Sequence, residues 1–261
     1  MTLPHMEIDG EHATADLLAA RLLDNYGHFT AMQVRDGRVR GLAHHLRRLD
    51  EATRELFGAE LDGTRVREHV RHALATADLR DASVRVHVHW PQGYGQASLM
   101  VIVRPPQTMD PAPKRLVAVE HAREVAHIKH LGGFGQAHHW RAALREGYDE
   151  ALLTLPDGTV TEGAITNVAF WDGTCLVWPQ APSLLGMTMA VLAPRLPSAR
   201  RRVTVDDLGA YRSAFVTNSQ GLAPVRSVEV PWRSLSYAFE VDEELVARVR
   251  AEYEAVEWDV I

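Results

Sequence analysis

The chain has little cysteine, no long apolar run and no excess of positive charge. Its single cysteine, Cys175, excludes an internal disulfide framework and suits a reducing compartment. No apolar run reaches the roughly 18 residues that a membrane span needs, and no basic segment followed by an apolar one opens the chain, so we expect a cytoplasmic protein. A formal net charge of -6 argues against nucleic acid as a partner.

Lysine is also scarce. Of the 28 basic side chains only two are lysines, Lys114 and Lys129, and arginine supplies the rest. An amine can lose its proton and attack a carbonyl, whereas a guanidinium stays charged. Lys129 lies between a short apolar approach and a glycine pair in "HIKHLGGFG", which makes it a candidate Schiff-base former. The alternative is that Lys129 has no special role and is one of two lysines left by chance in a chain that favours arginine.

The rest of the composition is that of an ordinary globular protein, with 46% apolar and 24% charged residues. A length of 261 residues is close to that at which one core divides into two domains. The run "RPPQTMDPAPKR" contains four prolines and little apolar content. We therefore expect an α+β protein with an N-terminal domain over 1–106, a linker over 107–114 and a C-terminal domain over 115–261.

Turn and periodicity signals predict the elements of both parts. Before the linker they indicate a hairpin turning at Asp36-Gly37, a helix that ends at Gly58, a second helix over 64–77, and strands over 83–90 and 98–104. After it they indicate a helix over 134–148, hairpins turning at Asp157-Gly158 and Asp172-Gly173, a helix behind Gly186, and a strand that runs into a turn over 214–225. Polar residues at these turns are the natural place for a site.

A Schiff-base lysine that serves pyridoxal phosphate (PLP) needs three kinds of partner. A carboxylate must keep the pyridine nitrogen protonated, so that the ring can accept electrons. A cation, preferably arginine, should hold the phosphate. A helix N-terminus with a hydroxyl should offer backbone N–H groups to the same phosphate. The chain contains candidates for each.

Three blocks of sequence carry a family resemblance, in order, from about Tyr26 to Val228. They are "FTAMQVRDGRVRGLAHHLRRLDEA", the long run from "IKHLGGFG" through "VTEGAITN" to "LLGMTMAVL", and "FVTNSQGLAPVRSV". Together they resemble the class IV aminotransferases, the fold-type IV PLP enzymes, which include branched-chain and D-amino acid aminotransferases and aminodeoxychorismate lyase. The resemblance implies a small N-terminal α/β domain and a larger C-terminal domain with a barrel-like sheet.

The resemblance also implies roles for single residues. Lys129 would form the Schiff base, Glu162 would face the pyridine nitrogen, and Arg48 would hold the phosphate. Further phosphate contacts would come from two turns, at Met187, Thr188, Asn218 and Ser219. Substrate contacts are expected from His28, Phe134, Asn167 and His89, although an asparagine at the position of Asn167 more often supports its turn than contacts substrate. No metal is expected, because the 14 histidines form no cluster with trusted ligand spacing.

The implied reaction moves an amino group between an amino acid, or an amine, and a keto acid. Lys129, released by the incoming amine, would take the α-proton and return it to the cofactor. The resemblance further implies a homodimer.

Three positions depart from the family pattern. Phe134 stands where branched-chain members have a tyrosine, and Met189 stands where an arginine commonly follows the threonine. "PQGYGQ" offers no arginine for a substrate carboxylate. The carboxylate anchor is therefore unidentified, with Arg85, His87 and His89 as candidates.

Two other functions stay open. "IKHL", "FTAMQVRDG" and "TNS" resemble the lyase branch, which eliminates pyruvate to give p-aminobenzoate, although the basic residue that often follows "KHLN" is missing. A non-catalytic scaffold that binds a small ligand is the second alternative.

Overall fold

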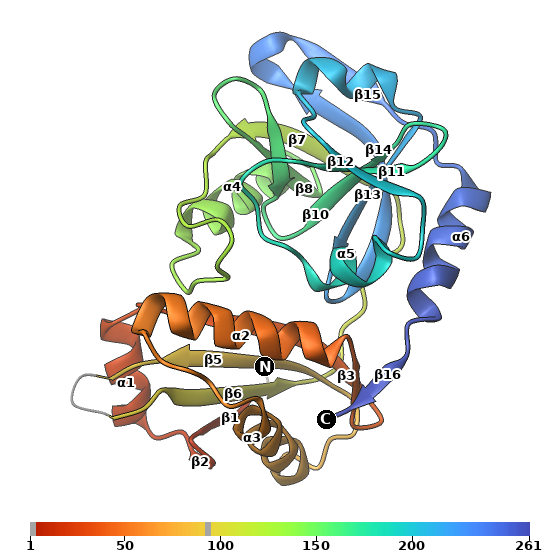
Figure 1. Ribbon diagram of the computed structural model, residues 1–261. Coiled ribbons are helices and arrows are strands. Elements are labelled where there is room, and N and C mark those ends of the chain that lie inside the picture. Colours follow the sequence, from red (N-terminus) through yellow and green to blue (C-terminus); the bar gives the residue numbers. More distant parts are fainter. Residues whose placement is uncertain (1–3, 92–94) are drawn as a thin grey trace. The chain divides into compact units, whose positions relative to one another are not determined.

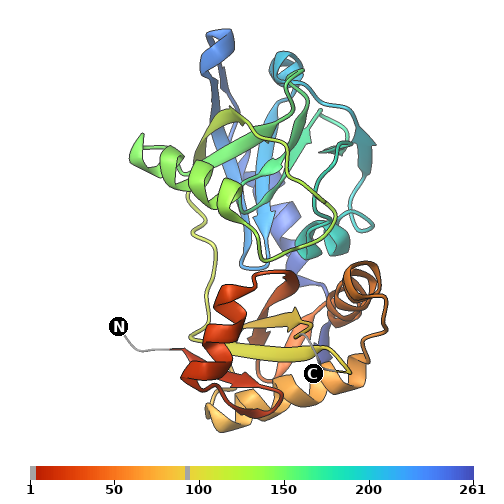
Figure 2. The same ribbon diagram turned by 90° about the vertical axis from the view of Figure 1, so that its left-hand side faces the viewer.

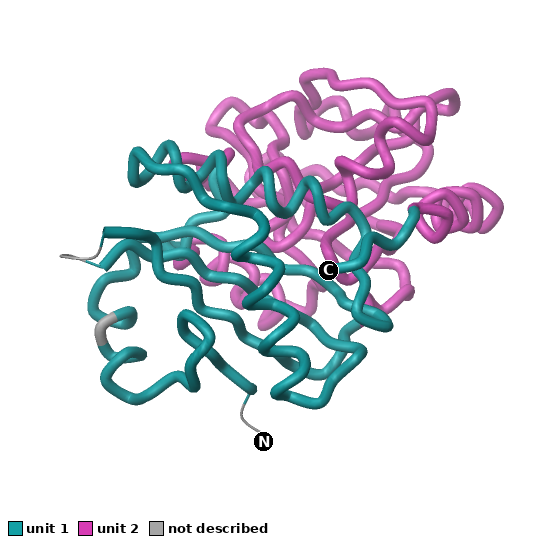
Figure 3. Tube along the Cα trace, turned by 60° about the horizontal axis from the view of Figure 1, so that its bottom comes forward, with its two compact units in different colours: residues 1–107, 128–132, 257–261 teal, residues 108–127, 133–256 magenta. Residues whose placement is uncertain are grey.

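The computed structural model describes residues 4–91 and 95–261. Gln92, Gly93 and Tyr94 of the "PQGYGQ" run therefore lie outside the described residues. The chain forms two compact units, shown in Figure 3. Unit 1 contains 1–107, 128–132 and 257–261, and unit 2 contains 108–127 and 133–256.

The strands described in unit 1 form one seven-stranded antiparallel sheet in the order β16-β4-β3-β5-β6-β1-β2. Its elements are β1 (His5–Ile8), β2 (Glu11–His12), β3 (Gly27–Arg35), β4 (Arg38–Arg40), β5 (Ala82–His89), β6 (Ser98–Arg104), β16 (Trp258–Val260), α1 (Ala15–Leu23), α2 (Leu42–Phe57) and α3 (Gly63–Thr76). Strand alternation gives the sheet two different faces. One face packs its valines against α2 and α3 in the main core. On the other, the polar face, Leu18 of α1 packs on a smaller apolar cluster, and His87 and His89 of β5 lie beside α1, which is the red helix in Figure 2.

The predicted elements of unit 1 are confirmed. The β3–β4 hairpin turns at Asp36 and Gly37, whose φ angles are 48° and 68°, as such a turn requires. Helix α2 ends at Gly58, whose φ of 70° lets its N–H reach the carbonyl of Arg54. No helix was expected over 15–23, although Thr14 is a natural N-cap, and in the structure its Oγ1 accepts from the Leu17 N–H at 3.4 Å.

The segment with Lys129 extends the sheet of unit 1. Phe29 N–H donates to the Lys129 carbonyl at 2.8 Å, and Leu131 N–H donates to the Gly27 carbonyl at 2.9 Å. Strand β16 likewise pairs with β4. Backbone pairing thus joins 128–132 and 257–261 to unit 1, although we expected both segments within a domain over 115–261. Residues 107–113, between β6 and β7, have no helix or strand.

Unit 2 contains a nine-stranded sheet, in the order β12-β11-β10-β13-β14-β7-β8-β9 with β15 paired to β14 (Figure 1). Its strands are β7 (Lys114–Glu120), β8 (Glu150–Thr154), β9 (Val160–Gly163), β10 (Asn167–Trp171), β11 (Leu176–Pro179), β12 (Ser198–Arg201), β13 (Ser213–Asn218), β14 (Gly221–Val230) and β15 (Leu235–Ala238). Strand β9 at one end also contacts β10 and β11 near the other end, so the sheet curls into a half-barrel. The expected barrel-like sheet is confirmed.

Helices and 3₁₀ turns complete unit 2. They are α4 (Phe134–Arg145), α5 (Met187–Leu192), α6 (Glu243–Glu254), η1 (Val205–Ala210) and η2 (Pro231–Arg233). The two predicted hairpins are confirmed, with Gly158 and Gly173 at φ angles of 79° and 98°. Among the described residues, none of the helices has the length and apolar character needed to cross a bilayer.

Candidate cofactor site

Within unit 1 the charges of Lys129 and Arg48 both act on one buried imidazole, that of His45. Burial, followed by the positive charges of Arg48, His44 and Lys129, lowers the pKa of His45 to about 3. His45 is therefore neutral at physiological pH, with two cationic side chains close to it. The amine of Lys129 also lies 4.8 Å from the ring centroid of Phe29, on β3.

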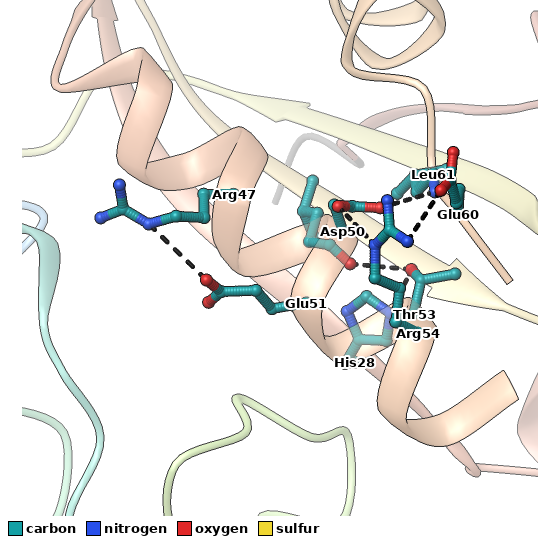
Figure 4. A network of polar contacts seen from close by, with 9 residues as sticks. His28, Arg47, Asp50, Glu51, Thr53, Arg54, Glu60 and Leu61 are labelled. Carbon is teal, nitrogen blue, oxygen red and sulfur yellow. Dashed lines mark hydrogen bonds and ion pairs between the residues drawn. The ribbon is translucent and has the colours of Figure 1, made fainter. Parts of the chain in front are cut away.

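Two histidine–threonine contacts fix α2, the helix of Arg48, against β3. Thr30 Oγ1 lies 2.7 Å from Nδ1 of His45. His28 Nε2 lies 3.0 Å from Oγ1 of Thr53, whose hydroxyl donates to the Leu49 carbonyl at 2.8 Å (Figure 4). Since that hydroxyl proton is already committed, His28 Nε2 must be the donor.

His28, expected to contact substrate, is thus fully buried on the α2 side of the sheet. Burial lowers its pKa to about 4. The structure shows it as part of the support of α2, with a neutral ring.

Within unit 2, Glu162 lies at the end of β9 with 4% of its surface exposed. Its Oε1 accepts from Nη1 of Arg123 at 3.2 Å, and its Oε2 accepts from the Leu184 N–H at 3.3 Å. The Arg123 side chain is as buried as that of Glu162. Burial lowers the pKa of Arg123 while the charge of Glu162 raises it, so the guanidinium and the carboxylate stabilise each other's charged form.

A second buried carboxylate holds the turn that follows Glu162. Glu150 accepts from the Ala151 N–H at 3.0 Å and from the Thr166 hydroxyl at 3.2 Å, with further support from the N–H groups of Ala164 and Ile165. Burial nevertheless outweighs these hydrogen bonds and raises its pKa to about 7. A side chain at Gly163 would meet the Thr166 hydroxyl at 2.1 Å, so this turn needs glycine there.

Asn167 links that turn to the start of α5. Its Nδ2 donates to the Leu184 carbonyl at 2.7 Å. Its Oδ1 lies so close to Gly186 that a Cβ there would be 1.8 Å from it. Asn167 therefore supports the turn that leads into α5, in line with the supporting role considered for it from the sequence.

The two turns expected on the phosphate side also meet. Thr188, in the first turn of α5, donates its hydroxyl to the Asn218 carbonyl at 2.6 Å. The Asn218 amide donates to the Ile165 carbonyl at 3.5 Å, and Ser219 lies in the turn between β13 and β14. Met187 is buried at the start of α5. Unit 2 thus brings Glu162, Asn167, Thr188 and Asn218 into one connected set of turns.

Two further residues expected to contact substrate, Phe134 and His89, are not part of the groups described so far, and His89 lines a separate pocket of unit 1. Phe134 is 81% exposed at the start of α4, where its ring stacks on His138 at 5.8 Å. His89 is buried at the end of β5, on the polar face of the unit 1 sheet. Neither contacts the groups described above through any interaction that the structure resolves for it.

Sequence reasoning missed Arg123 and Glu150. Arg123 carries no spacing signal, because it lies in the irregular segment before Lys129. Glu150 does carry one, since a carboxylate that opens the apolar strand "EALLT" must be buried with it. A buried acid beside a catalytic turn is worth testing as a supporting group.

These donors fit PLP. Lys129 carries an amine of the kind that an aldehyde requires, Arg48 carries a guanidinium of the kind that binds phosphate, and Glu162 is a buried carboxylate paired with Arg123. The backbone around Gly186 leaves no space for a side chain, so the start of α5 is closely fixed. Among the described residues, no group of three or more His, Cys, Asp or Glu side chains could hold a metal.

Known proteins share the family and the fold of this chain. The family model of class IV aminotransferases matches residues 27–228. No curated protein sequence matches the chain. The fold IV-transaminase CpuTA1 from Curtobacterium pusillum shares the fold, with 23% identity and a TM-score of 0.77 over 90% of this chain and 88% of that one. So does a "Putative 4-amino-4-deoxychorismate lyase" from Legionella pneumophila, with 20% identity and a TM-score of 0.80 over 91% of this chain and 93% of that one. A hypothetical aminotransferase from Mycobacterium tuberculosis in its PLP-bound form has 21% identity and a TM-score of 0.77 over 96% of this chain and 99% of that one.

Fold and family together define the class as the fold-type IV enzymes, which depend on PLP. The chain belongs to the class IV aminotransferase family.

Proposed function

We propose that the protein is a PLP-dependent aminotransferase that transfers an amino group from an amino acid or amine to a keto acid. The observation that supports the proposal is that the charges of Lys129 and Arg48 both act on the buried ring of His45. An amine and a guanidinium at one place are what an aldehyde and a phosphate on the same molecule require. Family membership supports the same assignment.

In this proposal each residue has one task. Lys129 holds the cofactor covalently and, once released by the incoming amine, moves a proton between substrate and cofactor. Arg48 holds the phosphate, together with the N–H groups of Met187 and Thr188 at the start of α5 and the turn of Asn218 and Ser219. The Thr188 hydroxyl, which donates to the Asn218 carbonyl, fixes the two turns to each other. Glu162, charge-balanced by Arg123, accepts from the pyridine N–H. The bound cofactor supplies an electron sink for the α-carbanion.

Covalent labelling tests the role of Lys129. The protein is incubated with PLP, reduced with borohydride, digested and analysed by mass spectrometry. We expect the label on Lys129 in the wild-type protein and none at position 129 in Lys129→Arg. Lys114→Arg is a matched control, because Lys114 is the other lysine of the chain and binds Asp110 at 3.0 Å. Labelling of Lys114 in the wild type, or of neither lysine, would refute the assignment.

A product assay then separates transamination from elimination. A new keto acid with a new amine supports the aminotransferase, whereas p-aminobenzoate from aminodeoxychorismate supports the lyase. The fold shared with the Legionella protein makes the lyase the second candidate. A labelled protein that gives neither product with a panel of donors would favour a ligand-binding scaffold. We also propose a homodimer, which light scattering at several concentrations would test.

A further inference from the structure

The polar face of the unit 1 sheet carries a pocket that none of the cofactor residues uses. It lies between α1 and the strands β5 and β6, with a volume of about 570 Å³. This volume falls within the usual range for small-molecule sites. Its apolar wall includes Leu18, Leu22 and Met100, and its polar groups are Arg21, His87 and His89.

The charge at this pocket is positive. Burial lowers the pKa of His87 to about 4, and the largest further influences are the positive charges of Arg85, Arg21 and Arg104. Asp9 attracts Arg21 but already forms an ion pair with Arg65 at 2.9 Å, and the other acid near the pocket, Asp24, lies beside His89. Asp9 is thus shared between Arg21 and Arg65. The positive charge of Arg21 is only partly balanced, so it would attract an anion in the pocket.

Two imidazoles at the pocket, one buried and one half-buried, have unused hydrogen-bonding capacity. His89 is 3% exposed and neither ring nitrogen has a hydrogen-bond partner; its Nε2 lies 3.4 Å from an Asp24 oxygen, within ion-pair range but outside hydrogen-bond geometry. Nε2 of His87 is also buried without a partner. Buried ring nitrogens are normally paired, so these atoms indicate a missing polar group.

The ring of Phe29 lies between the amine of Lys129 and the pocket. The ring of Phe29 lies 4.8 Å from Nζ of Lys129 and 5.2 Å from the His87 ring. Leu131, two residues after Lys129, is part of the pocket wall. In an α-amino acid the carboxylate is only one carbon away from the amino group. It therefore cannot reach the His87 side of the Phe29 ring while the amino group is at Lys129. A carboxylate several carbons away from the amino group can reach the pocket.

We propose that this pocket binds the distal carboxylate of a substrate with an apolar body, such as an ω-amino acid or the corresponding oxo acid. Arg21 binds the carboxylate, His87 and His89 donate to it or to its hydration, and the leucine and methionine side chains cover the chain of methylenes. As a substrate assignment this rests on the proposed function. Arg21 was not among the candidate anchors drawn from the sequence, because an arginine in an unassigned helix carries no signal.

Calorimetry with substrate analogues that lack an amine tests binding without chemistry. We expect hexanoate to bind the purified protein at least about tenfold more tightly than hexan-1-ol, because the alcohol lacks the charge. Arg21→Met should weaken hexanoate binding at least about tenfold and Arg21→Lys should restore part of it. The exposed Arg38→Met is the matched control in the same unit and should bind hexanoate like the wild type. Circular dichroism confirms that each variant is folded.

Kinetics and labelling separate this inference from the proposed function. With 6-aminohexanoate and hexylamine as donors, Arg21→Met should raise KM at least about tenfold for the first and leave the second nearly unchanged. Hexanoate that does not bind, that binds no better than hexanol, or that binds Arg21→Met as tightly as the wild type would overturn the inference even if Lys129 is labelled. Binding that depends on Arg21 in a protein that fails to label at Lys129 would remove the proposed function and leave a carboxylate site.

Discussion

Glu150 should dominate the pH dependence of the stability of unit 2 around strand β8. Its folded-state pKa is about 7, whereas its ordinary value is 4.5. Between these pH values the unfolded chain ionises Glu150 while the folded protein keeps it protonated. Stability contributed by this group is therefore present in full below pH 4.5 and is lost as the pH rises to 7. The difference between the two pKa values corresponds to about 3 kcal/mol.

Glu150→Gln removes this titration while keeping the size of the side chain. The glutamine oxygen can still accept from the Ala151 N–H, but its NH₂ group would face the other donors of the turn. We expect a constant loss of about 1–2 kcal/mol at all pH values from the mismatched donor. On top of this, the variant should gain up to about 3 kcal/mol relative to the wild type between pH 4.5 and pH 8.

Amide hydrogen exchange of strand β8 in urea, at several pH values, measures this locally. Glu146→Gln is the matched control, because Glu146 is an exposed glutamate of the same unit. The slope with pH is the test, since the constant loss says nothing about titration. If the difference between wild type and Glu150→Gln stays flat within about 0.5 kcal/mol over this range, then burial does not raise the pKa of Glu150 and the reasoning is wrong.

Two further substitutions probe the turns of unit 2. Gly186→Ala should displace Asn167, because the new Cβ would stand 1.8 Å from Oδ1, and we expect an unfolding midpoint in urea lowered by the equivalent of about 2–4 kcal/mol. The matched control is Gly133→Ala, because Gly133 has a φ of -87° and its nearest neighbour, Oε1 of Gln136, lies at 3.9 Å. A loss for Gly186→Ala no larger than that of the control would contradict this. Arg123→Met should leave Glu162 buried without its ion pair. We expect the free energy of unfolding to fall by about 3–5 kcal/mol at pH 8, and by less at lower pH, where Glu162 can take up a proton. A loss independent of pH would argue that the pair is not ionised.

Local signals predicted the elements well where glycine or turn chemistry set their ends. Gly58, Gly158 and Gly173 each mark an element end in the structure, and each adopts the positive φ that a side chain disfavours. The division into domains follows different physics. Residues 128–132 join unit 1 through backbone hydrogen bonds to β3, and no composition or proline signal in "HIKHL" reports such long-range pairing.

For the candidate site, the sequence identified residues with distinctive chemistry and missed those that act through burial. Lys129 is conspicuous because lysine is rare in this chain, and family resemblance located Arg48 and Glu162. Arg21 is one arginine among many, and only the folded sheet shows that a pocket and two unsatisfied imidazoles lie beside it. Asn167 and His28 show the converse, since their side chains are occupied in supporting α5 and α2.

Glu150 and Glu162 are both almost fully buried, yet their surroundings differ in one respect that decides what each can do. Glu150 has only amide and hydroxyl donors, and burial raises its pKa to about 7, so it exchanges a proton near neutrality. Glu162 has a guanidinium at 3.2 Å. A full charge compensates desolvation far better than dipoles do, so Arg123 is what allows a carboxylate to remain ionised there. A protonated acid could not keep a pyridine nitrogen protonated. The proposed electron sink therefore depends on Arg123 as much as on Glu162, although Arg123 needs no contact with the cofactor.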